Sequence, residues 1–114
     1  MKNSFALYVP DVTLEPDPLD PAQIVSGSPE VSSKVLWEAE DGRQIRGIWQ
    51  ITPGVVTDVE VDEICVVIDG VATVEVEGGE TFTVASGDVV VLNAGDRTTW
   101  TIHETLRKVY TTNR

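Results

Sequence analysis

From Lys34 onward the chain consists of short β-prone runs separated by glycine-containing turn sequences, and no stretch has a convincing helical period. The runs are rich in valine, isoleucine and threonine, which favour strands. Eight short strands at this spacing predict an all-β sandwich or barrel rather than an α/β fold. The expected strands are Val35–Ala39, Gln44–Ile51, Ile64–Ile68, Thr73–Val76, Thr81–Val84, Val89–Leu92, Thr98–Ile102 and Lys108–Thr111, with turns at Asp41-Gly42, Asp69-Gly70, Gly78-Gly79, Ser86-Gly87 and Ala94-Gly95.

The first third of the chain differs, because five of the six prolines fall within it and each removes a backbone hydrogen-bond donor. We therefore divide the chain into an irregular N-terminal arm, residues 1–33, and a β-barrel, residues 34–114. Ile24 and Val25, followed by a turn sequence, are expected to anchor the arm to the barrel or to a second subunit. The alternative is a disordered acidic leader, which the apolar residues of the arm disfavour.

The amino-acid composition of the chain limits its expected binding partners and its expected cellular compartment. At 114 residues the chain is long enough for one domain. A formal charge of -11 repels phosphate backbones and anionic lipids, which argues against nucleic acid and membrane partners. The single cysteine, Cys65, gives no internal disulfide, and no apolar run approaches the ~20 residues that a membrane span needs. We expect a cytoplasmic protein.

Strand alternation predicts which side chains face inward. In the strand that begins at Thr98, the side chains of Thr98, Trp100 and Ile102 share one face, so an inward Trp100 makes His103 an outward residue. We also expect Glu63 and Cys65 to point inward together, with Asp62 on the opposite face.

Two ordered motifs carry a resemblance to a known family. The phrase Gly47-Ile48-Trp49-Gln50-Ile51-Thr52-Pro53-Gly54, followed by Asp62-Glu63-Ile64-Cys65-Val66-Val67-Ile68-Asp69-Gly70, resembles the first cupin motif. Gly87-Asp88-Val89-Val90-Val91-Leu92-Asn93-Ala94-Gly95-Asp96 resembles the start of the second. The C-terminal Thr99-Trp100-Thr101-Ile102 and Arg107-Lys108-Val109-Tyr110 are similar to small RmlC-like cupins grouped with (S)-ureidoglycine aminohydrolase and the ethanolamine-utilisation cupin. The resemblance implies a double-stranded β-helix, or jelly-roll barrel.

In metal-binding cupins these motifs supply three histidines and one glutamate to a single ion. By this resemblance Glu63 matches the glutamate, whereas the histidine positions fall near Thr57 and Val59 and at Thr98, and Asn93 replaces the usual proline. One carboxylate cannot form a transition-metal site, so we expect no metal; if a divalent metal does bind, Glu63 is its ligand. Asp58, Glu60, Asp62 and Cys65 are near in sequence and could form an oxygen-rich or mixed site, but alternation places Asp62 on the face opposite Glu63. Asp58 and Glu60 share that outward face if they continue the same strand register.

The candidate ligand-binding residues inside the barrel are Glu63, Cys65, Thr98, Trp100 and Trp49. A buried thiol beside a carboxylate, with no inward histidine or lysine expected, should be a poor nucleophile. Buried Glu63 needs a hydrogen-bonding or cationic partner, for which Arg97 is the nearest candidate in the chain. Trp100 and Trp49 could form a flat platform for a ligand, or could be plain core.

Two functions remain open at this stage. The first is metal-free binding of a small polar metabolite in the barrel. The alternative is an enzyme related to ureidoglycine aminohydrolase, such as an aminohydrolase, lyase or isomerase, with Glu63 as general acid or base and the catalytic residues otherwise unknown. Because two-fold pairing is the default for homo-oligomers, we also expect a homodimer.

Overall fold

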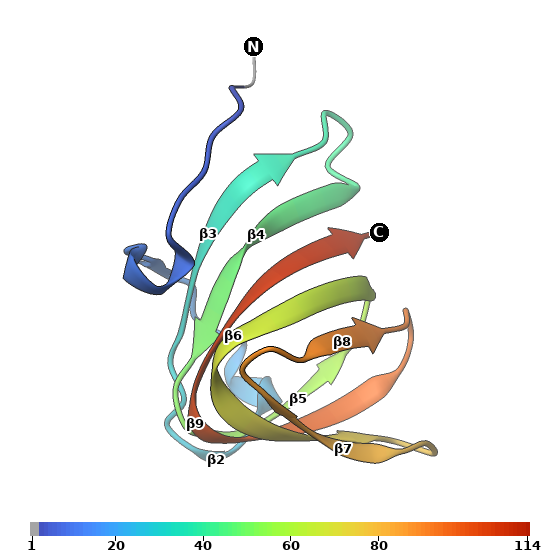
Figure 1. Cartoon of the computed structure of the whole chain (residues 1–114). Helices are drawn as coiled ribbons and strands as arrows, with labels where there is room; N and C mark the ends of the chain where they lie inside the picture. Colours follow the sequence, from blue (N-terminus) through green and yellow to red (C-terminus); the bar gives the residue numbers. More distant parts are fainter. Residues whose placement is uncertain (1–2) are drawn as a thin grey trace.

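Two long antiparallel strands, β6 (Asp62–Val76) and β9 (Arg97–Asn113), form the centre of the fold in this computed structural model, which describes residues 3–114. The other strands pair around them into a single curled sheet (Figure 1). They are β1 (Glu15–Pro16), β2 (Ile24–Gly27), β3 (Val31–Glu38), β4 (Gln44–Ile51), β5 (Gly54–Val59), β7 (Thr81–Ala85) and β8 (Val89–Leu92). The all-β fold predicted from the strand spacing and the jelly-roll barrel implied by the cupin resemblance are both confirmed.

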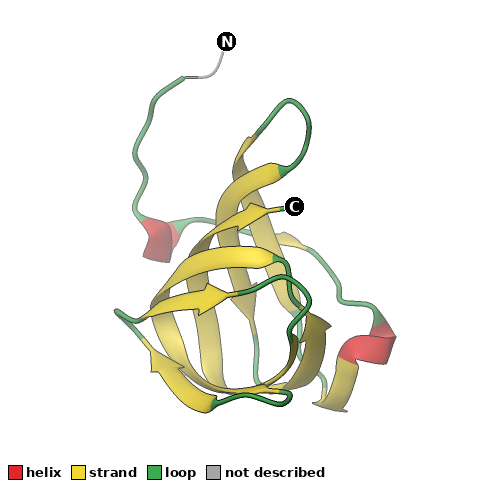
Figure 2. Ribbon diagram, turned by 90° about the vertical axis from the view of Figure 1, so that its right-hand side faces the viewer, coloured by secondary structure: helices red, strands yellow, loops and turns green. Residues whose placement is uncertain are grey.

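The sheet closes into a barrel because β6 and β9 pair with each other and each also pairs with two further strands. The order β1-β3-β4-β9-β5-β2 runs along one path, while β6 pairs with β7, β8 and β9. The register between β6 and β9 shifts three times between Val67 and Ala72, and such irregularities bend a sheet. One half of each strand therefore belongs to each wall of the barrel. Figure 2 shows the strands curling around the interior.

The sequence pattern placed Asp69-Gly70 in a turn between two strands, but the chain continues through it as one strand. Gly70 adopts a φ of 96° at the bend, and its Cα packs against the backbone of Thr105 and Leu106. A glycine at positive φ that lets two backbones approach is typical of such a corner. The runs expected at Thr98–Ile102 and Lys108–Thr111 are likewise one strand, β9.

The core fills the closed part of the barrel. Its buried members come from every large strand and include Ile51, Val67, Val74 and Leu106, each at most 1% exposed. Trp100 and Ile102 are buried and His103 is exposed, as alternation predicts. His103 contacts the Thr73 hydroxyl on the outer surface.

The proline-rich arm is ordered and partly β-structured. It contains two short 3-10 helices, η1 (Val9–Asp11) and η2 (Pro21–Gln23), and strands β1 and β2, which pair with β3 and β5. Arg107 holds η1 on the outside of the barrel by donating hydrogen bonds to the backbone oxygens of Val9 and Val12. Gln23 and Thr57 exchange two hydrogen bonds that fasten η2 to β5, so this part of the arm lies beside the open end of the barrel. Within residues 3–114 no helix is long and apolar enough to cross a membrane.

Candidate functional site

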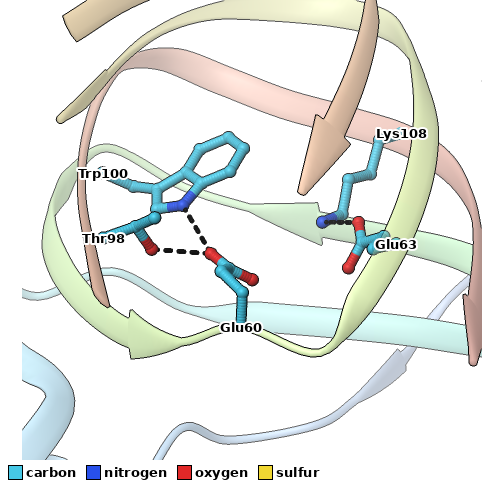
Figure 3. Close-up of polar contacts among 5 residues, drawn as sticks. All are labelled: Glu60, Glu63, Thr98, Trp100 and Lys108. Carbon is cyan, nitrogen blue, oxygen red and sulfur yellow. Dashed lines mark hydrogen bonds and ion pairs between the residues drawn. The ribbon is translucent and has the colours of Figure 1, made fainter. Parts of the chain in front are cut away.

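A cavity of about 320 Å³ opens into the barrel between the arm and the inner faces of β4, β5, β6 and β9. Its walls combine two indole rings, those of Trp49 and Trp100, with the ionisable side chains of Glu60, Glu63 and Lys108. Figure 3 shows Glu60, Glu63, Thr98, Trp100 and Lys108 converging on the interior from three sides. The cavity is at the small end of the range that ligand pockets occupy.

Glu60 is the acceptor of the first polar network. Its Oε2 accepts a hydrogen bond of 2.6 Å from the Thr98 hydroxyl and one of 3.2 Å from Trp100 Nε1 (Figure 3). The residue is 6% exposed, and burial raises the pKa of its carboxyl above the ordinary value, although the Thr98 hydrogen bond offsets part of that rise. A carboxyl in this position favours its neutral form more than a carboxyl in water does.

Asp58 lies beside Glu60 at the mouth of the cavity. Burial raises the pKa of the Asp58 carboxyl, while hydrogen bonds from the Val59 backbone and from Glu60 lower it. The negative charge of Asp58 in turn raises the pKa of Glu60. Because one negative charge disfavours a second one beside it, the two carboxyls of this pair ionise less readily than isolated carboxyls do.

Lys108 and Glu63 form the second network. Lys108 Nζ donates to Glu63 Oε2 at 2.7 Å, and each side chain is 9% exposed. Burial alone would lower the pKa of Lys108, but the Glu63 carboxylate outweighs it, so the pKa lies above its usual value. The ammonium also lies 4.6 Å from the ring centroid of Trp49 and 5.5 Å from that of Trp100, within cation–π range. Lys108 is therefore a fixed positive charge inside the barrel.

The structure places the residues singled out from the sequence in different surroundings. Glu63, Trp49 and Trp100 line the cavity, and Thr98 is buried behind Glu60. Cys65 is 1% exposed and lies outside the cavity wall; burial raises the pKa of its thiol to about 11, and the charge of Lys108 reverses only part of that shift. Cys65 is thus a packed, unreactive thiol rather than a nucleophile.

Three details of the sequence-based interpretation were wrong. Asp58 and Glu60 do not face outward with Asp62, because β5 ends at Val59 and the alternation of β6 does not extend back across the intervening loop. The partner of Glu63 is Lys108 rather than Arg97. A lysine does face the interior, although none was expected.

The residues at the family's metal positions do not fit a metal ion. Thr57, Val59 and Thr98 offer no imidazole, and Glu63 is engaged by Lys108. Within the described part of the chain, no three histidine, cysteine, aspartate or glutamate side chains are grouped so as to hold an ion. The Lys108 ammonium lies against the carboxylate that a metal would need, and two cations cannot share that position.

The comparisons with known proteins agree with the fold. Residues 38–110 match a family described as the EutQ-like cupin domain. A solved protein of unknown function from Pseudomonas syringae pv. tomato is 28% identical with a TM-score of 0.81, over 90% of this chain and 45% of that longer one. A putative ethanolamine utilization protein Q from Salmonella typhimurium is 26% identical with a TM-score of 0.64, over 74% of this chain and 69% of that one.

The EutQ protein of Clostridium difficile, at 22% identity, shares the fold, with a TM-score of 0.74 over 95% of this chain and 85% of its own. No curated protein matches the chain. The barrel and its inward-facing polar cavity define a small cupin. Since the matched segment spans well over half of the chain, the protein belongs to the EutQ-like cupin domain family.

Proposed function

We propose that this protein binds a small polar metabolite in the barrel cavity without the histidine-bound metal of other cupins. The observation that carries the proposal is the position of Glu60. Its Oε2 is fixed by Thr98 and Trp100, whereas its other oxygen points away from those two residues toward the interior (Figure 3). A carboxyl held in this way presents one oriented polar group to an incoming molecule.

The rest of the cavity suits such a molecule. Trp49 and Trp100 supply flat apolar surface, and Glu60 and Tyr110 supply polar groups. Aromatic surface beside polar groups that can orient a ligand is typical of a small-molecule site. With about 320 Å³ of space, the ligand would be a metabolite of only a few carbon atoms rather than a nucleotide or a peptide.

The test is a thermal-shift screen of small polar metabolites against the wild type and a Trp100→Phe variant. Phenylalanine keeps an aromatic ring at this position but removes the donor to Glu60. A true ligand should raise the Tm of the wild type and raise it less in Trp100→Phe. Trp37→Phe is the matched control, because Trp37 contacts Arg46 and does not line the cavity. Equal shifts in all three proteins would argue against binding in the barrel.

An enzyme remains the second candidate, and the raised pKa of the Glu60 carboxyl favours it. A carboxyl whose pKa is raised by burial can act as a general acid on a bound substrate. The sequence favoured Glu63 as the general acid or base, but Glu63 is paired with Lys108. Among the carboxyls of the cavity, Glu60 is therefore the better candidate for a general acid. The test is turnover of any ligand found in the screen. If Glu60 is the general acid, Glu60→Gln should abolish turnover even at a ligand concentration that saturates the variant.

A further inference from the structure

The balance of charge in the cavity points to the class of ligand. Four carboxyl groups line it, against two basic side chains, of which Lys108 is already neutralised by Glu63. The groups that face Glu60 across the cavity come from the arm, β5, β6, β9 and the C-terminus: Asp17, Asp58, Glu63, Lys108, Tyr110 and Arg114. An anionic ligand would add to this excess of negative charge, whereas a cation would offset it.

The carboxyls of Asp58 and Glu60 form the place where that cation would bind. Glu60 uses one oxygen for Thr98 and Trp100, and both residues of the pair line the cavity. Burial raises the pKa of both carboxyls, and the negative charge of Asp58 raises that of Glu60 further. A primary ammonium group has several N–H donors, so it could donate hydrogen bonds to both carboxylates at the same time. A single proton between the two carboxylates forms fewer hydrogen bonds.

The aromatic wall supports the same class of ligand. The Lys108 ammonium lies 4.6 Å from the centroid of Trp49 and 5.5 Å from that of Trp100. These rings therefore already stabilise one alkylammonium group in the interior of the same barrel. The alkyl part of a small amine would pack against their apolar surface while its charged end reached Asp58 and Glu60.

We propose that the ligand is a small organic cation carrying a primary ammonium group, which binds between the carboxyls of Asp58 and Glu60. At a pH where Glu60 is protonated in the free protein, its proton leaves to solvent as the ammonium group binds. This inference rests on the proposed function, since it names the ligand class of the same cavity. Binding and proton release are one exchange: the protein loses a proton and gains a cation. The affinity then rises with pH, about tenfold per pH unit, as long as Glu60 is protonated in the free protein, and levels off above that range.

The experiment uses three probes of nearly equal size: n-propylammonium, 1-propanol and propionate. Each is titrated into the 114-residue protein labelled with nitrogen-15, and the indole N–H signals of Trp49 and Trp100 report entry into the cavity. Calorimetry in two buffers of different ionisation enthalpy then counts the protons released. We expect n-propylammonium to shift the Trp100 signal with release of a proton, and the other two probes to leave the signal in place.

Two variants test whether Glu60 is the residue that binds n-propylammonium and releases the proton. Glu60→Gln keeps an acceptor for Thr98 and Trp100 but carries no proton to exchange, so binding should weaken at least tenfold and proton release should vanish. Glu75→Gln, a change on the exposed outer face of β6, is the matched control and should behave as the wild type.

Each other outcome overturns the inference in a distinct way. If propionate or 1-propanol shifts the Trp100 signal and n-propylammonium does not, the cavity binds small molecules but the cationic class is wrong. If n-propylammonium binds without proton release, or binds Glu60→Gln as tightly as the wild type, then the proposed exchange of a proton for the ammonium group at Glu60 is wrong. If none of the probes enters, the cationic class is wrong, and a negative metabolite screen then removes the proposed function as well.

Discussion

Lys108 Nζ lies 2.7 Å from Glu63 Oε2 inside the barrel, at the carboxylate that corresponds by resemblance to the metal-binding glutamate of other cupins. A positive charge that belongs to the chain therefore lies directly against this carboxylate. Trp49 packs against the ammonium and Glu63 neutralises it, so both contacts offset the free-energy cost of burying the Lys108 charge. This arrangement leaves the second carboxyl, Glu60, as the group available to a ligand.

The Lys108–Glu63 pair should be costly to break from one side. Lys108→Met leaves Glu63 as a buried, unpaired carboxylate, so we expect a loss of about 3–5 kcal/mol in the free energy of unfolding. The double variant Lys108→Met/Glu63→Leu removes both charges and should recover most of that loss. Urea denaturation of the three proteins measures the difference. A double variant no more stable than the single one would show that the pair is not the cause.

Glu60 should give stability a pH dependence of predictable sign. Its pKa is raised in the folded protein, so the stabilising contribution of the neutral form is present below the ordinary value of 4.5 and is lost as pH rises through the folded pKa. Glu60→Gln has no such titration. Relative to that variant, the wild type should therefore lose stability from pH 4.5 upward. Denaturation at a series of pH values tests this, and parallel curves for the two proteins would contradict it.

Two glycines with the same backbone conformation should respond very differently to alanine. Gly70 has a φ of 96° and Gly87 a φ of 95°, so both substitutions incur the strain of the left-handed region, about 1–3 kcal/mol. At Gly87 an added Cβ meets open space, but at Gly70 it would lie 2.5 Å from Leu106 Cα. Gly70→Ala should therefore prevent folding or lower the Tm far more than Gly87→Ala. Similar Tm values would rule out a close-packed corner at Gly70.

The expected homodimer stays a prediction, and the outer face of β6 and β8 is where we would test it. Ile64 lies opposite Val91 and Val66 opposite Val89, and all four side chains are exposed and uncharged on a chain of net charge -11. A second copy could approach this face without charge repulsion. Light scattering after gel filtration should give a dimer for the wild type and for Val25→Lys on β2, and a monomer for Val91→Lys. A monomeric wild type would contradict the expectation.

Alternation along the chain was enough to predict the positions of Trp100, Ile102 and His103, because β9 keeps a regular period of two there. The same even-numbered positions continue through Leu106 to Lys108 and Tyr110, and they could have identified Lys108 as inward-facing. That signal was missed because β9 was interpreted as two strands with an unspecified connection. A lysine among these inward positions would have pointed to a buried cation.

Glu60 could not be placed in the same way. It follows the end of β5, and its backbone N–H and C=O pair with Asp96 and Gly95 in the facing loop. These long-range contacts turn its side chain toward Thr98 and Trp100, and no local pattern encodes them. The cavity itself is also a result of how the two walls and the arm come together, which a strand pattern does not specify.

The most direct test of the central claim, that Lys108 takes the place of a metal, is elemental analysis of the protein purified without a histidine tag. The wild type and a Glu63→Gln variant should both contain far less than one equivalent of any transition metal or divalent cation, even after incubation with zinc, manganese or nickel followed by desalting. One equivalent of metal in the wild type that is lost in Glu63→Gln would contradict the account, because Glu63 would then hold an ion and not the Lys108 ammonium.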